Sequence, residues 1–343
     1  MLGLTQQLGR QMPIKNLHVV VPIFNDWVSF LALLKDIDHV SSTLDCAVSV
    51  IAVDDGSTEE TPASINDISS FPSLREIKVV KLATNVGHQR AIAIGISMAV
   101  SETDADAIVV MDSDGEDRPQ DIPRLLAATQ GRSEFAVVAR RARRTNTLIF
   151  KVFYALYKAV FGILTGRSIN FGNFCLISRG YAKRLIMTPE LWNNLPAAVL
   201  RSRVPVVELP TDRGNRYAGT SKMNYVSLVV HGMGGISVYS DVIFVRMLAA
   251  TAAFLVFSVV VIVSVISMKL FTTMNTPGWT TTVVFSILII LLQTIVTTLM
   301  TMLLLLNNRS QRLVIPRRDY REYVASGGEV DSPQAHAIKR ATQ

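Results

Sequence analysis

The chain has 343 residues, of which 49% are hydrophobic, so it can form one large domain or two ordinary ones with a core of normal size. Its 34 basic and 27 acidic residues give a net charge of +7, which suits a protein that lies against anionic lipid headgroups or binds a polyanionic substrate. No helix-turn-helix, RNP or zinc-binding pattern accompanies this charge, so nucleic acid is not expected as a partner. The two cysteines, Cys46 and Cys175, provide neither a metal-binding spacing nor a disulfide framework, in agreement with a reducing compartment.

Short apolar runs predict a series of buried strands in the N-terminal part of the chain. Several of these runs end at Gly, Pro, Asn or Asp residues, and a segment of helical character follows the first and the third. The runs recur roughly every thirty residues, which is the rhythm of βαβ units. The sequence therefore predicts an α/β fold with a mostly parallel, helix-covered sheet. The predicted strands lie at residues 17–24, 47–53, 77–82, 107–111 and 135–139.

Acidic and amide side chains follow three of the predicted strands. Because parallel strands present their carboxyl ends at one edge of a sheet, we expect these groups to converge on one crevice. Asp112 and Asp114 alternate by two, so they point to the same side and can share a hard cation such as Mg²⁺ or Mn²⁺. A single Asp-x-Asp can equally be a solvated turn, but the coincidence of three strand ends favours a site. The groups are Asn25 and Asp26, Asp54 and Asp55, and Asp112 and Asp114.

Two common phosphate-binding motifs are missing from the sequence. No Gly-x-Gly-x-x-Gly follows the first strand, and no Gly-x₄-Gly-Lys-Ser/Thr occurs, which disfavours a dinucleotide dehydrogenase and a P-loop NTPase. Phosphate groups would therefore be held by a metal ion and by cationic side chains. The loop at 213–222 is basic and punctuated by glycine, as expected for a flexible lid over a diphosphate.

Two long uncharged runs near the C-terminus predict transmembrane helices. Residues 247–268 and 280–306 each exceed the ~20 residues that cross a ~30 Å hydrocarbon core. A buried hairpin of a soluble core is the less favoured alternative, because such long uncharged runs are rare there. Cationic residues flank both outer ends, so we expect a multi-pass protein of the inner or cell membrane with its N-terminal domain in the cytoplasm. Residues 1–16 lack a continuous apolar region, and no cleavable secretory signal is expected.

Further segments are predicted from their composition. Residues 148–164 are rich in aromatic side chains with few charges, which favours a helix lying in the membrane interface, although an ordinary core helix is the alternative. Residues 225–245 are a second candidate of this kind. The polar segment from Ser326 onward has no periodicity and is expected to be disordered.

The order of short motifs along the chain resembles that of a known family. The motifs are Pro22-x-Phe-Asn25, Val53-Asp-Asp-Gly-Ser-Thr58, Asn85-x-Gly87, Met111-Asp-Ser-Asp114 and Arg216-x-x-Gly-x-Ser-Lys222. Together they resemble the inverting family 2 glycosyltransferases of the GT-A fold over about residues 14–310. Within that family the chain is most similar to the polyprenyl-phosphate glycosyltransferases, of the dolichol-phosphate mannose synthase and bactoprenol glucosyltransferase type.

The resemblance implies a reaction and a division of the chain. The implied reaction moves a sugar from a nucleotide diphosphate sugar, UDP- or GDP-linked, to a membrane polyprenyl phosphate with the help of Mg²⁺ or Mn²⁺. A homo-oligomer is compatible with the sequence. We divide the chain into an N-terminal tail (1–13), a GT-A glycosyltransferase domain (14–223), a juxtamembrane interfacial helix (224–245), two transmembrane helices within 246–306, and a basic, then disordered cytoplasmic tail (307–343).

The resemblance also implies roles for particular residues. The catalytic set is Asp112, Asp114, Arg140 and Asn173, and the metal ligands are Asp112, Asp114 and Glu116. Many relatives have Gln where Glu116 stands, and several have an acid where Asn173 stands, so a catalytic base at 173 is in doubt. Arg140 matches an arginine that contacts phosphate. The implied nucleotide-sugar contacts are Pro22, Phe24, Asn25, Asp26, Asp54, Asp55, Asn85, Gly87, Arg216, Ser221 and Lys222.

Two other functions are weighed against this one. A processive polysaccharide synthase usually carries a Gln-x-x-Arg-Trp motif, and none of Trp27, Trp192 and Trp279 lies in that pattern. A non-catalytic, sugar-nucleotide-binding membrane scaffold would not need the Asp112/Asp114 pair. Both alternatives are therefore less favoured than the transferase.

Overall fold

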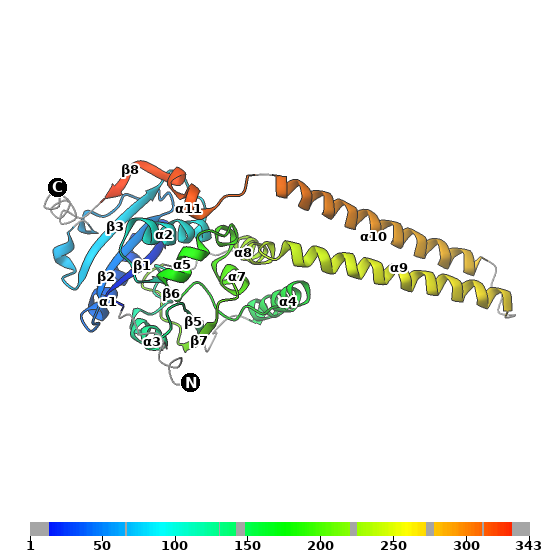
Figure 1. Ribbon diagram of the computed structural model, residues 1–343, viewed down its shortest axis with the longest axis horizontal. Coiled ribbons are helices and arrows are strands. Elements are labelled where there is room, and N and C mark those ends of the chain that lie inside the picture. Colours follow the sequence, from blue (N-terminus) through cyan, green and yellow to red (C-terminus); the bar gives the residue numbers. More distant parts are fainter. Residues whose placement is uncertain are drawn as a thin grey trace, which may run out of the picture. The chain divides into compact units, whose positions relative to one another are not determined.

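The computed structural model describes residues 14–65, 67–129, 131–141, 148–219, 225–271, 278–310 and 312–330 (Figure 1). The chain divides into two compact units. Among the described residues, the first unit holds those up to Leu156, from Ser168 to Val238 and from Val314 onward. The second unit holds Tyr157–Arg167 and Tyr239–Leu313.

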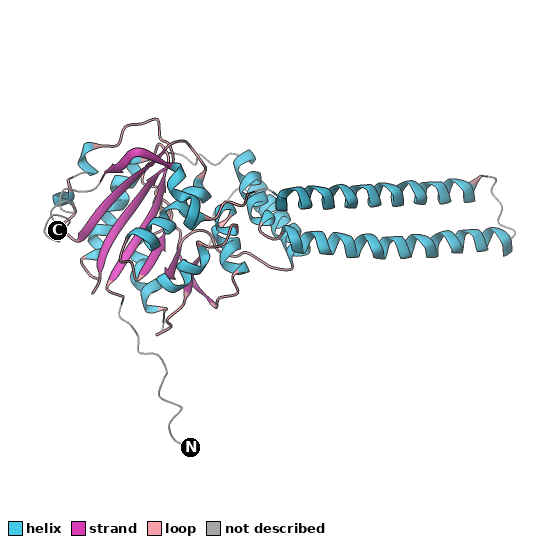
Figure 2. Cartoon of the chain, turned by 45° about the horizontal axis from the view of Figure 1, so that its top comes forward, coloured by secondary structure: helices cyan, strands magenta, loops and turns pink. Residues whose placement is uncertain are grey.

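One eight-stranded sheet forms the centre of the first unit, with helices on its faces (Figure 2). Its order is β7-β5-β6-β4-β1-β2-β3-β8, and only β6 and β8 run antiparallel to their neighbours. The predicted α/β fold with a mostly parallel sheet is confirmed. The strands are β1 (Asn16–Ile23), β2 (Ala47–Asp54), β3 (Leu74–Leu82), β4 (Ala107–Val110), β5 (Ala136–Arg141), β6 (Cys175–Ser178), β7 (Val206–Thr211) and β8 (Val324–Val330).

Helices cover the sheet on both sides and form two apolar layers. On one side α1 packs Phe30, Leu33 and Leu34 in a cluster with Leu17 and Val19 of β1. The helices of the first unit are α1 (Trp27–Ser41), α2 (His88–Glu102), α3 (Ile122–Ala127), α5 (Arg179–Leu185), α6 (Glu190–Asn193), α7 (Leu195–Arg201), α8 (Tyr225–Ser237) and α11 (Pro316–Asp319), with 3₁₀ turns η1 (Ala63–Ile65), η2 (Ile68–Ser70), η3 (Pro119–Asp121) and η4 (Tyr320–Tyr323).

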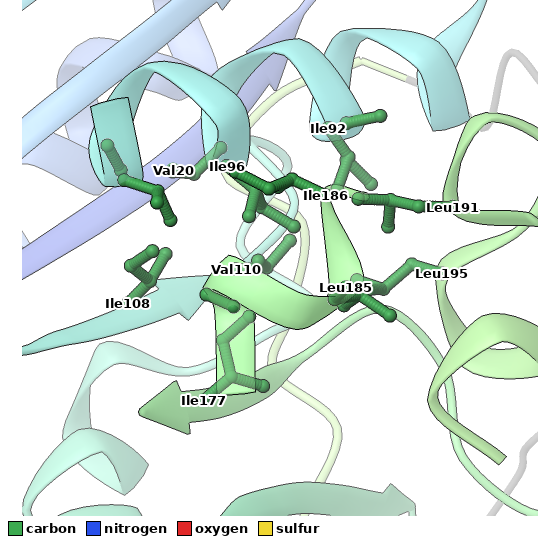
Figure 3. Close-up of a cluster of buried hydrophobic side chains, with 14 of the residues drawn as sticks. Val20, Ile92, Ile96, Ile108, Val110, Ile177, Leu185, Ile186, Leu191 and Leu195 are labelled. Carbon is green, nitrogen blue, oxygen red and sulfur yellow. The ribbon is translucent and has the colours of Figure 1, made fainter. Parts of the chain in front are cut away.

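The other apolar layer is built around α2. Figure 3 shows Ile92 and Ile96 of α2 together with Val20 of β1 and Val110 of β4. Gly95 lets α2 approach the sheet closely, because a Cβ at this position would run into the side chain of Val20. This packing fixes the first turn of α2, which carries polar residues, at the edge where β1, β2 and β4 end.

The segment after the second long helix returns to the first unit. β8 pairs antiparallel with β3, and Tyr320 is only 3% exposed within the apolar layer around α2 (Figure 1). The Tyr320 hydroxyl donates to Glu102 Oε1 at 2.8 Å, and the Tyr323 and Trp192 rings lie 4.9 Å apart. The prediction of disorder from Ser326 onward is therefore wrong for residues 326–330, which belong to β8, and α11 and η4 precede them. Residues 331–343, like the predicted tail 1–13, lie outside the described residues.

The second unit contains two long apolar helices. They are α9 (Ser240–Phe271) and α10 (Trp279–Ser310), and each has 32 residues, enough to span about 48 Å at 1.5 Å per residue. By length and composition both can cross a membrane, and most of their apolar side chains, such as Phe257 and Leu292, face outward. A hydrogen bond between the hydroxyls of Thr251 and Thr298 (2.9 Å) joins them. The two helices fit the predicted transmembrane hairpin.

The C-terminal end of α4 (Leu148–Thr165) is tied to the start of α9 within the second unit. The rings of Phe161 and Tyr239 meet edge to face with centroids 5.8 Å apart. Gly166, in the left-handed region with φ +72°, ends the helix, and Arg246 donates to the carbonyl oxygen of Ile163 at 2.7 Å. This bond satisfies one of the carbonyl groups that the end of a helix leaves without an intrahelical partner.

Candidate active site

The parallel strands β1, β2 and β4 bring the predicted polar groups to one edge of the sheet. Ile23 pairs with Asp54 and Val20 with Val110, so the residues after each strand are neighbours. The backbone N–H of Asn25 donates to Ser57 Oγ at 2.9 Å, and Ser113 Oγ donates to a carboxylate oxygen of Asp26 at 3.2 Å. The three strand ends are therefore hydrogen-bonded to one another.

The first strand end shapes the loop after the second. Asn25 adopts φ +51°, and its Oδ1 accepts hydrogen bonds from the N–H groups of Thr58 (2.9 Å) and Glu59 (3.2 Å). Pro22 is buried in β1, whereas Phe24 is 43% exposed. The side chain of Asn25 thus holds a loop, and the ring of Phe24 lies at the surface of this edge.

Asp54 and Asp55 are buried and hold the backbone of neighbouring loops. Asp54 Oδ1 accepts from the N–H of Ser57 at 2.8 Å. Asp55 accepts from the N–H groups of Val86 (2.7 Å) and Gly87 (3.0 Å), and its own carbonyl oxygen accepts from Asn85 Nδ2 (3.0 Å). Burial raises the pKa of Asp55, and the two backbone donors oppose that rise. These carboxylates shape the loops around the crevice, and their direct contact with a nucleotide stays a prediction.

The residues after β4 form what we call the acid loop, residues 112–117. The N–H of Asp112 donates to Asp117 Oδ2 at 3.1 Å, and the N–H of Glu116 donates to Asp114 Oδ1 at 2.8 Å. Gly115 turns the loop with φ +87°. Burial and the negative charge of Asp112 raise the pKa of the Asp114 carboxyl. Two carboxylates are thus crowded in a partly desolvated site, where a nearby positive charge stabilises them.

Residues 213–217 supply that positive charge from the loop that the sequence predicted to be a lid. Arg216 Nη2 lies 2.7 Å from Asp114 Oδ2, its Nε lies 3.2 Å from Glu116 Oε1, and Arg213 also pairs with Glu116 Oε1. Backbone bonds join the two loops as well, since the N–H of Gly214 donates to the Glu116 carbonyl (2.9 Å). Ser221 and Lys222, predicted to contact the nucleotide sugar, lie outside the described residues.

The acid loop has the donors that Mg²⁺ or Mn²⁺ prefers, but few of them. Within the described residues, no three His, Cys, Asp or Glu side chains are grouped as metal ligands. Mg²⁺ typically binds through one or two carboxylates and completes its shell with water and substrate phosphate oxygens. Asp112 and Asp114 fit that kind of site. The Glu116 carboxylate is engaged by Arg213 and Arg216 instead, so its predicted role as a third ligand would need those ion pairs to open.

Asn173, in the loop before β6, lies beside the first turn of α2. Its Oδ1 accepts from Gln89 Nε2 at 2.9 Å, and its Nδ2 lies 3.0 Å from His88 Nε2. His88 Nε2 lies 3.2 Å from Asp112 Oδ1, so Asn173 is connected to the acid loop. Burial lowers the pKa of His88, but the charge of Asp112 and the hydrogen bond to it outweigh burial and raise this pKa. Sequence reasoning missed His88 and Gln89, although their place directly after Asn85-x-Gly87 was a usable signal.

Arg140, the arginine predicted to contact phosphate, pairs with a neighbouring strand. Its Nη1 lies 3.4 Å from Glu208 Oε2 on β7, and the side chain is half exposed. A direct role in the reaction would require Arg140 to exchange this partner for a phosphate. That role stays a prediction.

Comparisons with known proteins find one family model and several relatives that are similar to this chain. Residues 18–185 match the model of glycosyl transferase family 2. An uncharacterised glycosyltransferase of Synechocystis sp. is 26% identical over 226 residues, which are 65% of this chain and 69% of that protein. The undecaprenyl-phosphate 4-deoxy-4-formamido-L-arabinose transferases of Klebsiella pneumoniae subsp. pneumoniae and Photorhabdus laumondii subsp. laumondii are 25% and 27% identical. The match covers 63% of this chain and 65% of each of these two transferases, so it spans slightly less than two thirds of their length.

Solved structures that resemble this chain share less sequence identity with it than these relatives do. Glucosyl-3-phosphoglycerate synthase from Mycobacterium tuberculosis, in complex with Mn²⁺, UDP-glucose and phosphoglyceric acid, has a TM-score of 0.46 and 17% identity over 67% of this chain and 80% of that chain. Mannosyl-3-phosphoglycerate synthase from Rubrobacter xylanophilus has a TM-score of 0.46 and 14% identity over 77% of this chain and 78% of that chain.

Proposed function

The chain carries a glycosyltransferase family 2 domain and is a glycosyltransferase, and from this premise we propose that it moves a sugar from a nucleotide diphosphate sugar to a membrane polyprenyl phosphate. The proposed donor is UDP- or GDP-linked, and the transfer is inverting. The observation that carries the proposal is the acid loop at the carboxyl ends of the parallel strands, with Asp112 and Asp114 next to the arginines of residues 213–217. In open α/β sheets this edge is where ligands bind.

The charges of the crevice suit a departing diphosphate. Asp112 and Asp114 would hold Mg²⁺ or Mn²⁺, which when bound neutralises the negative charge that develops on the leaving group. Arg216 now pairs with Asp114 and would exchange this carboxylate for a phosphate, for which a guanidinium offers a bidentate fork. Phe24 and the loops held by Asn25, Asp54 and Asp55 would enclose the base and ribose.

Two observations support polyprenyl phosphate as the proposed acceptor: the long apolar helices of the second unit and the names of the relatives. Two helices long enough to cross a membrane keep the chain next to lipid-borne substrates, and two of the relatives are named for transfer to undecaprenyl phosphate. A phosphate monoester has a second pKa near 6, so it is largely a dianion at pH 7 and needs orientation more than a base. An amide at position 173 is compatible with such an acceptor. We place the protein in the cell membrane with its family 2 domain, about residues 14–223, on the cytoplasmic side, because cationic residues flank the hairpin.

Purified protein in detergent or in vesicles tests the proposal directly. We expect sugar from one member of a panel of nucleotide sugars to appear in the organic phase, at the mass of a polyprenyl-phosphate sugar. Asp114→Asn should lower turnover roughly 100-fold or more, because the cation loses a ligand. Asp212→Asn is the matched control, since Asp212 is an exposed acid outside the acid loop, and it should stay near wild type.

Three results would contradict the proposal. Full activity in excess chelator would show that the reaction does not need a divalent metal ion. A polymeric product would indicate a processive synthase, and binding of nucleotide sugar without turnover would indicate a non-catalytic scaffold.

A further inference from the structure

Two arginines of the predicted lid pair with carboxylates that were predicted to bind a metal ion. Arg216 Nη2 lies 2.7 Å from Asp114 Oδ2, and Arg213 and Arg216 both pair with Glu116 Oε1. The side chains of Asp114 and Glu116 are only 15% and 10% exposed, so water and salt screen these ion pairs little. Two of the three predicted metal ligands are therefore already neutralised by cationic side chains of the same chain.

A guanidinium and a divalent cation compete for the same carboxylate. A metal ion held by Asp114 would lie beside the positive charge of Arg216, and like charges at contact distance repel each other in a partly buried site. Asp114 can therefore bind a metal ion well only after Arg216 has left it. By linkage, a ligand that draws Arg216 away raises the affinity for the metal ion, and the metal ion raises the affinity for that ligand by the same factor.

Tyr217 fastens this arrangement to helix α1. Its hydroxyl donates to Asp36 Oδ2 on α1 at 2.6 Å, a bond that we call the latch. Its backbone N–H donates to the carbonyl oxygen of Asp114 at 3.0 Å, and its ring lies so close to Gly115 that a Cβ at 115 would run into it. Because Tyr217 directly follows Arg216 in the chain, these contacts hold the arginine beside the acid loop.

We infer that Tyr217 and Asp36 are positioning residues that keep Arg216 on Asp114, so that a divalent cation is bound tightly only together with a diphosphate. A diphosphate offers oxygens that match the bidentate fork of the Arg216 guanidinium, so it releases Asp114. The species recognised is then the metal complex of the nucleotide diphosphate, and the free cation is bound poorly. The inference rests on the proposed function and adds an order of binding to it.

Binding of Mn²⁺ alone tests the latch. Purified full-length protein in detergent is titrated with Mn²⁺, and the free ion is measured by electron paramagnetic resonance. We expect Tyr217→Phe to bind Mn²⁺ about tenfold more tightly than the wild type, because a hydrogen bond to a carboxylate no longer holds Arg216 in place. General damage to the site would weaken binding instead. Tyr323→Phe, which removes a hydroxyl from η4, is the matched control and should leave this Kd unchanged.

A second variant breaks the latch from its other side. Asp36→Ala removes the acceptor of the Tyr217 hydroxyl, together with a longer contact from Gln120 Nε2 (3.4 Å), and it should also tighten the binding of Mn²⁺. Adding Tyr217→Phe to Asp36→Ala should then change the Kd less than twofold, because the hydroxyl has already lost its acceptor. A Kd for Mn²⁺ that is equal in the wild type and both single variants would overturn the inference, and so would fully additive effects.

Nucleotide binding distinguishes this inference from the proposed function. Calorimetry with UDP and with GDP is carried out on the wild type, once in excess Mn²⁺ and once in excess chelator. We expect one of the two nucleotides to bind about tenfold or more tightly with Mn²⁺ than with chelator. Wild-type protein that binds neither nucleotide in Mn²⁺ would refute the proposed function and the order of binding with it. Nucleotide binding that depends on Mn²⁺, with an unchanged Kd for Mn²⁺ alone in Tyr217→Phe, would refute only the latch.

Discussion

The C-terminal segment should contribute to the stability of the first unit, and Tyr320→Ala measures by how much. Tyr320 is 3% exposed in the layer around α2, so removing its ring leaves a cavity that typically costs about 3–5 kcal/mol for a large aromatic residue. For a domain of about 150–250 residues, each kcal/mol shifts Tm by about 2–4 °C, so we expect a decrease of about 6–20 °C. Tyr320→Phe removes the hydrogen bond to Glu102 and the bond that the hydroxyl accepts from Arg321 Nε (3.1 Å). It should cost about 1–2 kcal/mol, because Lys78 and Arg321 still pair with the Glu102 carboxylate.

The assay is thermal unfolding of the purified full-length protein in detergent, followed by Trp fluorescence, since Trp192 contacts Tyr323 of the same segment. Arg317→Ala is the control, because this side chain is exposed and its change should stay within about 0.5 kcal/mol. A Tyr320→Ala variant that melts within 2 °C of wild type would show that the segment is not part of the folded domain.

Three further changes test other parts of the structure. Burial lowers the pKa of His18 to about 4, so between about pH 6.5 and pH 4 the unfolded chain binds a proton that the folded chain does not. The free energy of unfolding should therefore fall by up to about 3 kcal/mol from about pH 6.5 to about pH 4. In His18→Leu, melting curves should lack this dependence of stability on pH. Asp55→Asn replaces one of the two carboxylate oxygens that accept from the N–H groups of Val86 and Gly87 with an NH₂ donor, so one backbone donor loses its acceptor. This should cost about 1–3 kcal/mol, measured as a lower Tm at pH 7, whereas an unchanged Tm with weaker nucleotide binding would favour the predicted direct contact instead. Gly166→Ala forces a side chain into the left-handed region against Arg246 and should destabilise by about 1–2 kcal/mol, whereas Gly162→Ala, inside α4, should be neutral or stabilising in the same melting assay.

The sequence predicted the first five strands to within about three residues at each end, because each is a short apolar run whose ending is marked locally. It also located the acid loop, since residues that follow parallel strands meet wherever the strands themselves pair. It missed β6, which is apolar but only four residues long, and it missed β7 and β8, which lack that signal. β7 contains Glu208 and Pro210 at the edge of the sheet. In β8 a serine, two glycines and a glutamate interrupt the apolar residues, so its strand conformation depends on pairing with β3.

The candidate site was predictable where its residues are close in sequence and unpredictable where they are not. Asp112, Asp114 and Glu116 fall within one loop, and their spacing was visible. The contact of Gln89 with Leu195 joins residues 106 apart, and no local pattern reports such a contact. The partners of Arg216 were also missed, because the sequence assigned this arginine to a diphosphate, whereas in the structure it pairs with Asp114 and Glu116, more than 90 residues away in sequence.

The return of the chain to β3 after α10 has a consequence for biogenesis. Strand β8 leaves the ribosome only after both long helices, so the sheet gains its last strand after the hairpin has been synthesised. The residues before α9 and those after α10 belong to one folded unit, so both ends of the hairpin must emerge on the same face of any bilayer that the two helices cross. An insertion error that left one helix outside the bilayer would separate β8 from its partner strand. In a bilayer, β8 can therefore pair with β3 only when the hairpin crosses an even number of times.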